Sequence, residues 1–410
     1  MSEEAAAGFL ARTVRSLRHP NYRKYLGGHA LSVVGTWMQR VAQDWLVLEL
    51  TGDPVAVGTA LALQFLPTLL FGVWGGVLVD RVDRWRLLVA TQTASAVLAA
   101  VLAVSTVLGA TTLGLVYVMA ALLGFVTVVD SPARHTFVTD LVPPGDYVNA
   151  QALNSTIHNT GRLVGPAVAG LVIAAVGTGP AFGINAISFA AVLVGLARMD
   201  RSALHATTKA APGKGLAAAG LRYAWSHPEL RACLLLVAAV SLFSQNFRVV
   251  LPVAASEVLG GDAATYGYLT SALGLGAVLG ALGAASSVTV SGRKLLACAV
   301  ALGATNLLMA LVDRLVLALA CLVAMGVANI AFNTMARSLL QVRSAPEVQG
   351  RVMALHGLLN LGMMPLGGPL LGWVCAVAGA PWGFVVAGSA AVGAAALVAG
   401  RLATRERPSG

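Results

Sequence analysis

The segment RHTFVTDLVPPGDYVNAQALNSTIHNTGRLVGP, residues 134–166, returns in outline at residues 337–369. Its first arginine and two of its prolines recur there at a constant spacing: Arg134, Pro143 and Pro166 match Arg337, Pro346 and Pro369. A second set recurs upstream, with His19, Pro20, Arg23, Arg40 and Glu49 matching His227, Pro228, Arg231, Arg248 and Glu257. A repeat of about half the chain length indicates an architecture built twice from one unit.

The composition places both copies in a membrane. The chain is 57% hydrophobic and 11% charged, with mean hydropathy +0.79, whereas a soluble domain carries about a quarter charged residues. Residues 55–79 form a charge-free run of one helix length, and the charge-free runs 87–129, 163–197 and 352–400 exceed one crossing of a roughly 30 Å hydrocarbon core. Each long run contains a turn signal, at 109–114, 177–180 and 379–381. Further spans are expected near 22–48, 147–176, 231–256, 264–287, 295–312 and 315–336. The sequence therefore predicts an all-α integral membrane protein of twelve transmembrane helices in two six-helix halves, the plan of two-halved secondary transporters.

Charge placement predicts how the helices are oriented. Most of the 27 Lys and Arg residues fall in the N-terminal segment, the even-numbered connections and the C-terminal tail, whereas the odd-numbered connections carry acids. The positive-inside rule then puts both termini in the cytoplasm. Orientation accounts for the net charge of +10, so a nucleic-acid partner is not expected. The predicted organisation is a cytoplasmic segment 1–21, a six-helix half 22–197, a cytoplasmic linker 198–228, a second half 229–400 and a cytoplasmic tail 401–410.

The connection after the second predicted helix carries the first recognisable motif. It reads Gly76-Val-Leu-Val-Asp80-Arg81-Val-Asp83-Arg84 and resembles the G-x-L-a-D-R-x-G-R loop of the major facilitator superfamily, with Asp83 replacing the usual Gly. Gly76 is expected to allow close helix contact. The resemblance implies a cytoplasmic gating loop of Asp80, Arg81 and Arg84, which Asp130 at the inner end of the fourth helix would join.

The fifth predicted helix carries a second motif. Gly161-Arg-Leu-Val-Gly165-Pro166-Ala-Val-Ala-Gly170 resembles the g-x-x-x-G-P-x-x-G-G motif of drug:proton antiporters in this superfamily. Small residues at four-residue spacing let helices approach closely, and the proline bends the helix. Ordinary tight packing is the alternative explanation of this motif.

Longer stretches resemble one branch of the superfamily. These are Gly35-Thr-Trp-Met-Gln39-Arg40-Val-Ala-Gln43-Asp44-Trp45, then Gln64-x-x-Pro67, then Asn149-Ala-Gln-Ala-Leu-Asn154, and together they are similar to enterobactin exporters and macrolide-efflux proteins. The resemblance implies proton-driven export of a bulky amphiphile across a bacterial inner membrane. The proton gradient would be the energy source, with no cofactor, and the protein would act as a monomer on a small molecule within the lipid bilayer.

Polar groups in mid-membrane are expensive and are therefore functional candidates. Those on predicted mid-membrane turns are Gln39, Arg40, Gln43, Asp44, Asn154, His158, Arg162, Gln245, Asn246, Arg248, Asn329, Asn333, His356 and Asn360. Asp44 is the candidate coupling acid, since a carboxylate near a cation can alternate between charged and protonated forms. A permanent ion pair with Arg40, one helical turn away, is the alternative. His158 and His356 are candidates for a proton relay, or simply hydrogen-bonded groups. Arginines outnumber acids in this set, which predicts a positive cavity that tolerates anionic or polar-faced amphiphiles better than lipophilic cations.

Other functions remain open on the same frame. An importer or a lipid translocator is possible within transport, although the Gly-Pro motif argues against import. A non-transporting receptor or assembly factor is a different class, but it has no need of polar side chains in both halves. Nothing in the sequence indicates an enzyme or a metal site, because no catalytic constellation appears and the four cysteines lie singly in predicted helices.

Overall fold

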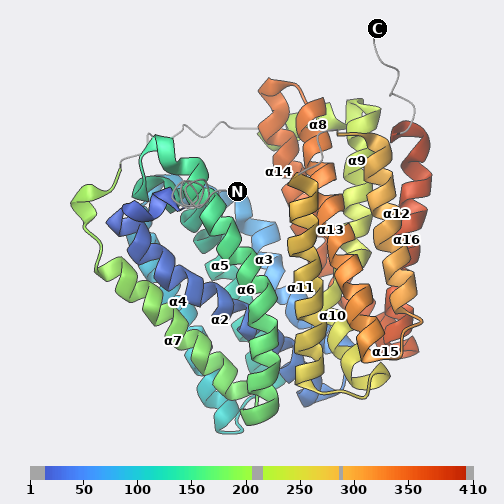
Figure 1. The fold of residues 1–410 in the computed structure, drawn as a ribbon, viewed down its shortest axis with the longest axis horizontal. Helices are drawn as coiled ribbons and strands as arrows, with labels where there is room; N and C mark the ends of the chain where they lie inside the picture. Colours follow the sequence, from blue (N-terminus) through green and yellow to red (C-terminus); the bar gives the residue numbers. More distant parts are fainter. Residues whose placement is uncertain (1–13, 206–215, 286–289, 403–410) are drawn as a thin grey trace, which may run out of the picture.

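The computed structural model describes residues 14–205, 216–285 and 290–402 (Figure 1). Within them every regular element is a helix. The first group of elements is η1 (Arg15–Arg18), α2 (Pro20–Thr51), α3 (Pro54–Arg81), α4 (Arg84–Val107), α5 (Leu113–Leu141), η2 (Pro144–Asp146), α6 (Tyr147–Val176), α7 (Thr178–Ala197) and η3 (Arg201–Ala203). Most of the predicted segment 1–21, part of the predicted linker and the tail from residue 403 lie outside the described residues.

The second group follows a short helix, α8 (Leu216–Ser226). It comprises α9 (Pro228–Ala239), η4 (Val240–Ser244), α10 (Phe247–Val253), η5 (Ala254–Val258), α11 (Ala263–Ala285), α12 (Gly292–Met309), α13 (Leu315–Arg343), α14 (Pro346–Gly362), α15 (Met364–Ala378) and α16 (Ala380–Leu402). The elements α9 to η5 follow one another as a single apolar span, and so do α14 and α15. In the described part of the chain, ten helical segments are long and apolar enough to cross a membrane. The all-helical membrane class predicted from composition is confirmed.

The predicted turn signals end helices as expected. Gly109, Gly177 and Gly379 all have positive φ, at 65°, 85° and 85°, a region that glycine enters without steric cost. The next helix then starts from a capping side chain in several places: Thr112 accepts from the amide of Leu115 before α5, and Asp53 accepts from the amide of Val55 before α3. These caps satisfy amide groups that the first turn leaves unpaired.

One predicted helix is less regular than expected. The span near 231–256 is interrupted between η4 and α10, where η4 and η5 are π-helical and Gln245 and Asn246 lie between them. The side-chain amide of Asn246 donates to the carbonyl oxygen of Leu242 at 2.7 Å, which supplies a bond at the break. π-helical segments of this kind are often found at functional sites.

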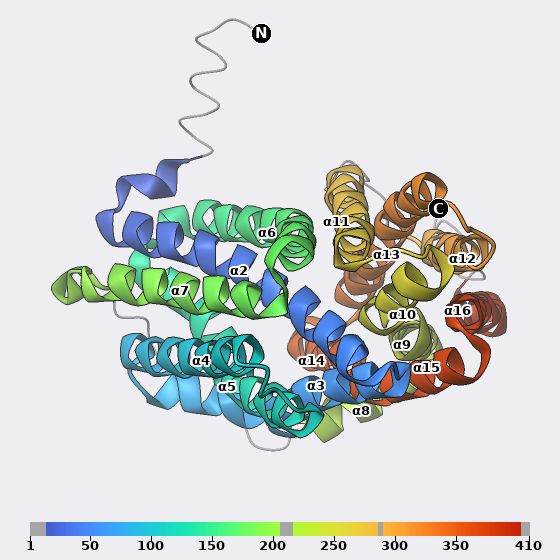
Figure 2. The same ribbon diagram turned by 90° about the horizontal axis from the view of Figure 1, so that it is seen from below.

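The helices pack in two groups, α2–α7 and α9–α16 (Figures 1 and 2). Between the groups the main contacts are those of α6 with α11 and of α3 with α15. In Figure 1 the groups lie together at the end where α2 finishes and α11 begins, and they diverge toward the end where α2 begins and α16 finishes. We call these the joined end and the divergent end.

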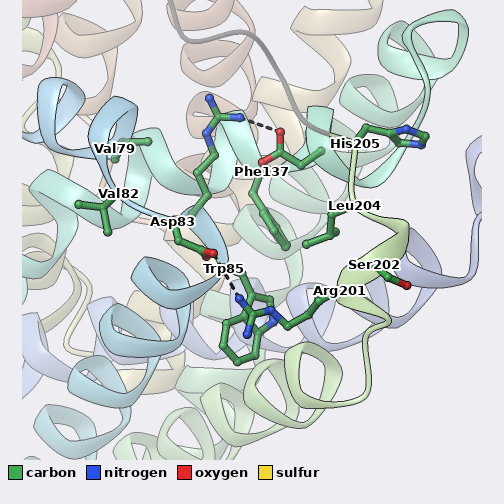
Figure 3. A pocket seen from close by; sticks show the side chains of 11 residues that line it. Val79, Val82, Asp83, Trp85, Phe137, Arg201, Ser202, Leu204 and His205 are labelled. Atoms are coloured by element: carbon green, nitrogen blue, oxygen red, sulfur yellow. Dashed lines mark hydrogen bonds and ion pairs between the residues drawn. The ribbon is translucent and has the colours of Figure 1, made fainter.

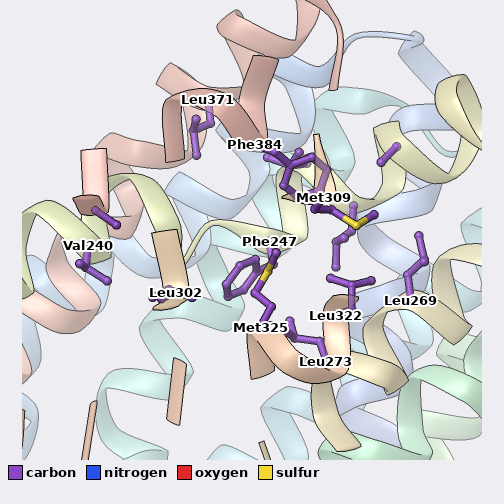
Figure 4. Packing of buried hydrophobic residues seen from close by; sticks show 14 of the residues in the cluster. Val240, Phe247, Leu269, Leu273, Leu302, Met309, Leu322, Met325, Leu371 and Phe384 are labelled. Carbon is purple, nitrogen blue, oxygen red and sulfur yellow. The ribbon is translucent and has the colours of Figure 1, made fainter. Parts of the chain in front are cut away.

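The interior and the surface of the bundle are both apolar. Figure 4 shows Phe247, Leu273, Leu322 and Met325 packed together in the second group, and all four are buried. Large apolar side chains also cover the outside, including Trp74 at 73% exposure and Leu397 at 85%. Such a surface is suited to lipid rather than to water.

Candidate functional site

A buried ion pair joins the two helix groups near the joined end. Asp44 of α2 is 2% exposed. Arg248 of α10 donates from Nε to its Oδ2 atom at 2.8 Å and from Nη2 to its Oδ1 atom at 2.7 Å. This two-bond geometry is the strongest form of an arginine–carboxylate pair. The two helix groups are therefore tied through one carboxylate.

Two further helices complete this network. The hydroxyl of Tyr266, on α11, donates to Oδ2 of Asp44 at 2.9 Å. The Nη1 atom of Arg248 donates to Oε1 of Gln64, on α3, at 3.0 Å. Both oxygens of the carboxylate are thus engaged. We refer to Asp44, Arg248, Tyr266 and Gln64 as the latch.

The latch corrects the expected pairing of Arg40 with Asp44. Arg40 lies one turn before Asp44 on α2, but its guanidinium carbon stands 4.5 Å from the centre of the Trp37 ring. The guanidinium of Arg162, on α6, also approaches this ring, at 5.8 Å. The carboxylate turns instead toward the second group, because Arg248 offers it two parallel donors there.

Several amides predicted for the cavity gather in the second group. The side-chain oxygen of Asn333 accepts from Asn360 at 2.7 Å and from Gln245 at 3.4 Å. The side-chain amide of Asn333 also donates to the backbone oxygen of Asn329 at 2.9 Å. The structure therefore brings together residues of α13, α14 and the break before α10. His356, four residues before Asn360 in the chain, is buried. Its Nε2 atom has no hydrogen-bond partner among the described residues.

The two glutamines of α2 are both buried. The Oε1 atom of Gln39 accepts from the side-chain amide of Asn185, on α7, at 2.5 Å, so this residue packs inside the first group. Gln43 is 1% exposed, and its Nε2 atom finds no partner in the described chain. Gln39 is thus not placed as the cavity prediction expected, whereas the prediction for Gln43 stays a prediction.

A second ionisable cluster lies inside the first group, and the sequence analysis named Asp130 and His158 but missed their partners Arg134 and His29. The Nη1 atom of Arg134 is 2.9 Å from Nδ1 of His29, and its Nε atom donates to Oδ2 of Asp130 at 2.5 Å. The rings of His29 and His158 are 5.2 Å apart. Asn154, predicted on the same stripe as His158, is 3% exposed. The four-residue spacing of Asp130 and Arg134 on one helix was the available signal.

The gating-loop prediction needs two corrections. Asp130 binds Arg134, Thr91 and Gln92, and among the described residues it forms no bond with Asp80 or Arg84. Arg84 instead pairs with Asp140 at 2.7 Å. Both acids lie on α5, and Asp140 is the nearer of the two to its C-terminal end.

The close helix contact expected of Gly76 belongs to its neighbour. A Cβ atom on Gly76 would meet no heavy atom within 4 Å, whereas one on Gly75 would collide with the backbone of Val128 on α5. A shift of one residue turns a helix position by about 100°, which moves it to another face.

The rest of the loop lies at the divergent end of the first group. A cavity of about 690 Å³ opens there, and its lining includes Asp83, Arg84 and Arg201. Figure 3 shows Arg201 beside Asp83 and Trp85, with an ion pair at 3.3 Å and a guanidinium carbon 4.3 Å from the Trp85 ring. Asp80 and Arg81 close the last turn of α3.

The glycine motif of α6 serves two neighbouring helices. Cβ atoms on Gly161 and Gly165 would meet Val33 and Trp37 of α2. A Cβ atom on Gly170 would stand 2.8 Å from the carbonyl oxygen of Ala263 on α11, and one on Gly267 would stand 2.5 Å from that of Pro166. The motif therefore gives α6 backbone-level contact with its own group on one face and with the second group on another.

Solved structures show which fold this is. A peptide transporter of the POT family aligns with a TM-score of 0.76 and 13% identity, covering 93% of this chain and 94% of its own. A bacterial homologue of the iron transporter ferroportin, in an inward-facing state, aligns with a TM-score of 0.71 and 15% identity, covering 94% and 99%. The fold is therefore the one that these two transporters share.

The chain belongs to the transmembrane secretion effector family of the major facilitator superfamily, whose model matches residues 12–409. It is therefore a multi-pass membrane protein of a transporter family and not an enzyme, and the resemblance found in the sequence is confirmed.

Three curated relatives are similar to parts or most of the chain. The Staphyloferrin A transporter of Staphylococcus aureus is 27% identical over 258 residues, which are 62% of this chain and 64% of that protein. The Multidrug efflux pump Tap of Mycolicibacterium fortuitum is 26% identical over 361 residues, 84% and 87% of the two chains. Macrolide efflux protein A of Streptococcus pyogenes is 26% identical over 145 residues, 35% and 36%. The match thus spans less than two thirds of the first relative's length.

Proposed function

We propose that this protein is a proton-driven exporter that moves a bulky amphiphilic small molecule out of the cytoplasm by alternating access. The relatives named as efflux pumps and as a siderophore transporter support export of this kind of compound. The observation that carries the mechanism is the bidentate pair of Asp44 and Arg248 across the two helix groups. The proton gradient supplies the energy, and a single chain in the membrane suffices.

The proposed topology has twelve spans with both termini in the cytoplasm. Ten of these spans are the apolar segments described above. The other two are α2 and α12, which pack along α7 and α16 respectively. Basic residues lie at the divergent end of the helices, with Arg18, Arg84 and Arg401 as examples, whereas acids such as Glu49 and Glu257 lie at the joined end. By the positive-inside rule, the divergent end faces the cytoplasm. The structure is then an inward-facing state, closed toward the exterior.

The latch couples this closure to proton occupancy. Both oxygens of Asp44 accept donors from the second group, and that arrangement requires an ionised carboxylate. A proton on Asp44 and a closed latch therefore exclude each other. Whatever protonates Asp44 weakens the outer closure, and whatever closes the exterior expels the proton.

This exclusion gives an export cycle. The amphiphile enters from the cytoplasm while the latch is closed. When the groups separate at the outer end, Arg248 leaves with the second group, and Asp44 becomes accessible to an exterior proton. After the amphiphile has left, reclosure re-forms the pair and releases the proton inward. Each cycle moves substrate outward and a proton inward.

The test is transport in proteoliposomes with an imposed pH gradient, against a panel of macrolides, siderophores and lipophilic dyes. We expect Asp44→Asn to lower gradient-driven export at least tenfold, because Asn cannot exchange a proton. Glu257→Gln is the matched control, since it removes an exposed acid from the joined end without touching the latch. Gradient-dependent export by Asp44→Asn at the rate of the control would refute the proposal.

A further inference from the structure

Two arginines near the middle of the membrane share one aromatic ring. Arg40 stands near the middle of α2 and Arg162 near the middle of α6. Their guanidinium carbons lie 4.5 Å and 5.8 Å from the centre of the Trp37 ring. An aromatic face attracts a cation, but one ring gives only a fraction of the stabilisation that a counter-ion gives.

Neither arginine has an acidic partner in the described part of the chain. Asp44 is one turn from Arg40, but its two oxygens are already engaged by Arg248 and Tyr266. These two positive charges thus form no ion pair with any side chain in residues 14–205, 216–285 and 290–402. Charged groups inside a membrane are costly and normally find a partner, so this pair is suited to a counter-ion supplied from outside the chain.

The glycine motif explains how the pair is built. A Cβ atom on Gly165 would lie 2.5 Å from Cβ of Trp37, so glycine there lets the indole occupy the seam between α2 and α6. Gly161 makes the same space beside Val33. Arg162 follows directly after Gly161, and this close approach carries it to the ring that Arg40 already covers. Both arginines keep partly exposed side chains, and so does Trp37.

We propose that Arg40, Arg162 and Trp37 form an anion site that binds the carboxylate, or a similar anionic group, of the transported amphiphile. A guanidinium offers a planar pair of donors that fits a carboxylate. The indole adds an apolar surface beside the charge, which suits a molecule that has both an acidic group and a hydrophobic body. This inference rests on the proposed export function, because it names the substrate class of that transporter.

The site is tested by binding to the purified full-length protein in nanodiscs, without any gradient. Carboxyfluorescein and rhodamine 123 are suitable probes, because they share a xanthene core and carry opposite charges. We expect carboxyfluorescein to bind more tightly, and we expect Arg40→Gln and Arg162→Gln each to weaken it about tenfold, the loss of one charge-assisted contact. Arg222→Gln is the matched control on the exposed face of α8. It should leave the affinity unchanged.

Unchanged carboxyfluorescein binding in both variants would refute the proposed anion site. An equal loss of both dyes would also overturn it, because the arginines would then support the fold rather than the anion. An anionic lipid could supply the same chemistry. Repeating the titration in nanodiscs with and without phosphatidylglycerol separates the two sources. If the protein binds phosphatidylglycerol at this site but does not bind carboxyfluorescein even in its absence, the assignment to substrate is overturned. Tight dye binding with no gradient-driven export would count against the proposed function alone.

Discussion

Removing Arg248 should open the exterior side of the protein. The substitution Arg248→Gln deletes two hydrogen bonds to Asp44, at 2.8 Å and 2.7 Å, and one to Gln64 at 3.0 Å. It leaves a carboxylate that is 2% exposed with only the hydroxyl of Tyr266. Breaking a buried ion pair by removing one partner costs about 3–5 kcal/mol.

We expect this free-energy cost to destabilise the conformation that is closed to the exterior, and not the folded state as a whole. In the proposed cycle the latch joins the helix groups only while the exterior is closed, so its loss should destabilise the closed state relative to the open one. Since about 1.4 kcal/mol is a factor of ten, the closed-to-open ratio should fall roughly a hundredfold to a few thousandfold. The double variant Asp44→Asn with Arg248→Gln should recover most of this loss, because no buried charge then remains unpaired.

Double electron–electron resonance between two spin labels measures the separation of the two helix groups directly. Spin labels on cysteines at Leu50 and Leu311 would mark the joined end of each group, since these side chains are 43% and 82% exposed. The native cysteines are replaced first. A longer distance should appear in Arg248→Gln and shorten again in the double variant. Identical distance distributions in the wild type and the single variant would refute the latch.

Three further predictions concern packing and ion pairs. Gly372→Ala should also favour the open exterior, because its Cβ would stand 2.5 Å from a backbone carbonyl of α3, whereas Gly393→Ala meets no heavy atom within 4 Å and should leave the label distance unchanged. Tyr266→Phe removes one hydrogen bond to a charged group, worth about 1.5–3 kcal/mol, so its pH-gradient-driven export should fall less than that of Asp44→Asn; a larger fall would contradict this ranking. Asp130→Asn should lower the midpoint of thermal unfolding, because its ion pair is only 14–15% exposed. Asp83→Asn should not, because its pair is 44–47% exposed and surface pairs contribute about 0–1 kcal/mol. Equal shifts in the last two variants would contradict the burial argument.

The sequence predicted the membrane class, the helix spans and their breaks with good accuracy. These features depend on local composition: a charge-free run, a turn glycine, a capping side chain. The α6 motif was also recognisable, because its glycines repeat at the spacing of one helix face.

The partner of Asp44 could not be predicted in the same way. Arg40 satisfied the one-turn rule, whereas Arg248 lies far along the chain and in the other half. The choice between them depends on how the two halves dock, and no local pattern records that docking. The break before α10 is similar, since Gln245 and Asn246 are polar but give no spacing signal for a π-helical turn.

The role of Asp130 was missed for a different reason. Its pairing with Arg134 was available from the four-residue spacing on one helix. The resemblance to gating loops directed attention to Arg84 instead, which pairs with Asp140 in the structure. Local spacing was the better guide here.

The glycine contacts between the groups also decide what can pass between them. At Gly372 beside Pro54, and at Gly170 beside Ala263, the two backbones are so close that there is no space for a side chain between them. A seam of that width leaves no room for an acyl chain, and the α3–α15 and α6–α11 contacts lie on opposite sides of the bundle in Figure 2. Lipid is therefore excluded from the interface at the joined end on both of these sides. In the proposed export cycle, the compound would therefore enter where the groups diverge, and its shape would have to suit that one opening.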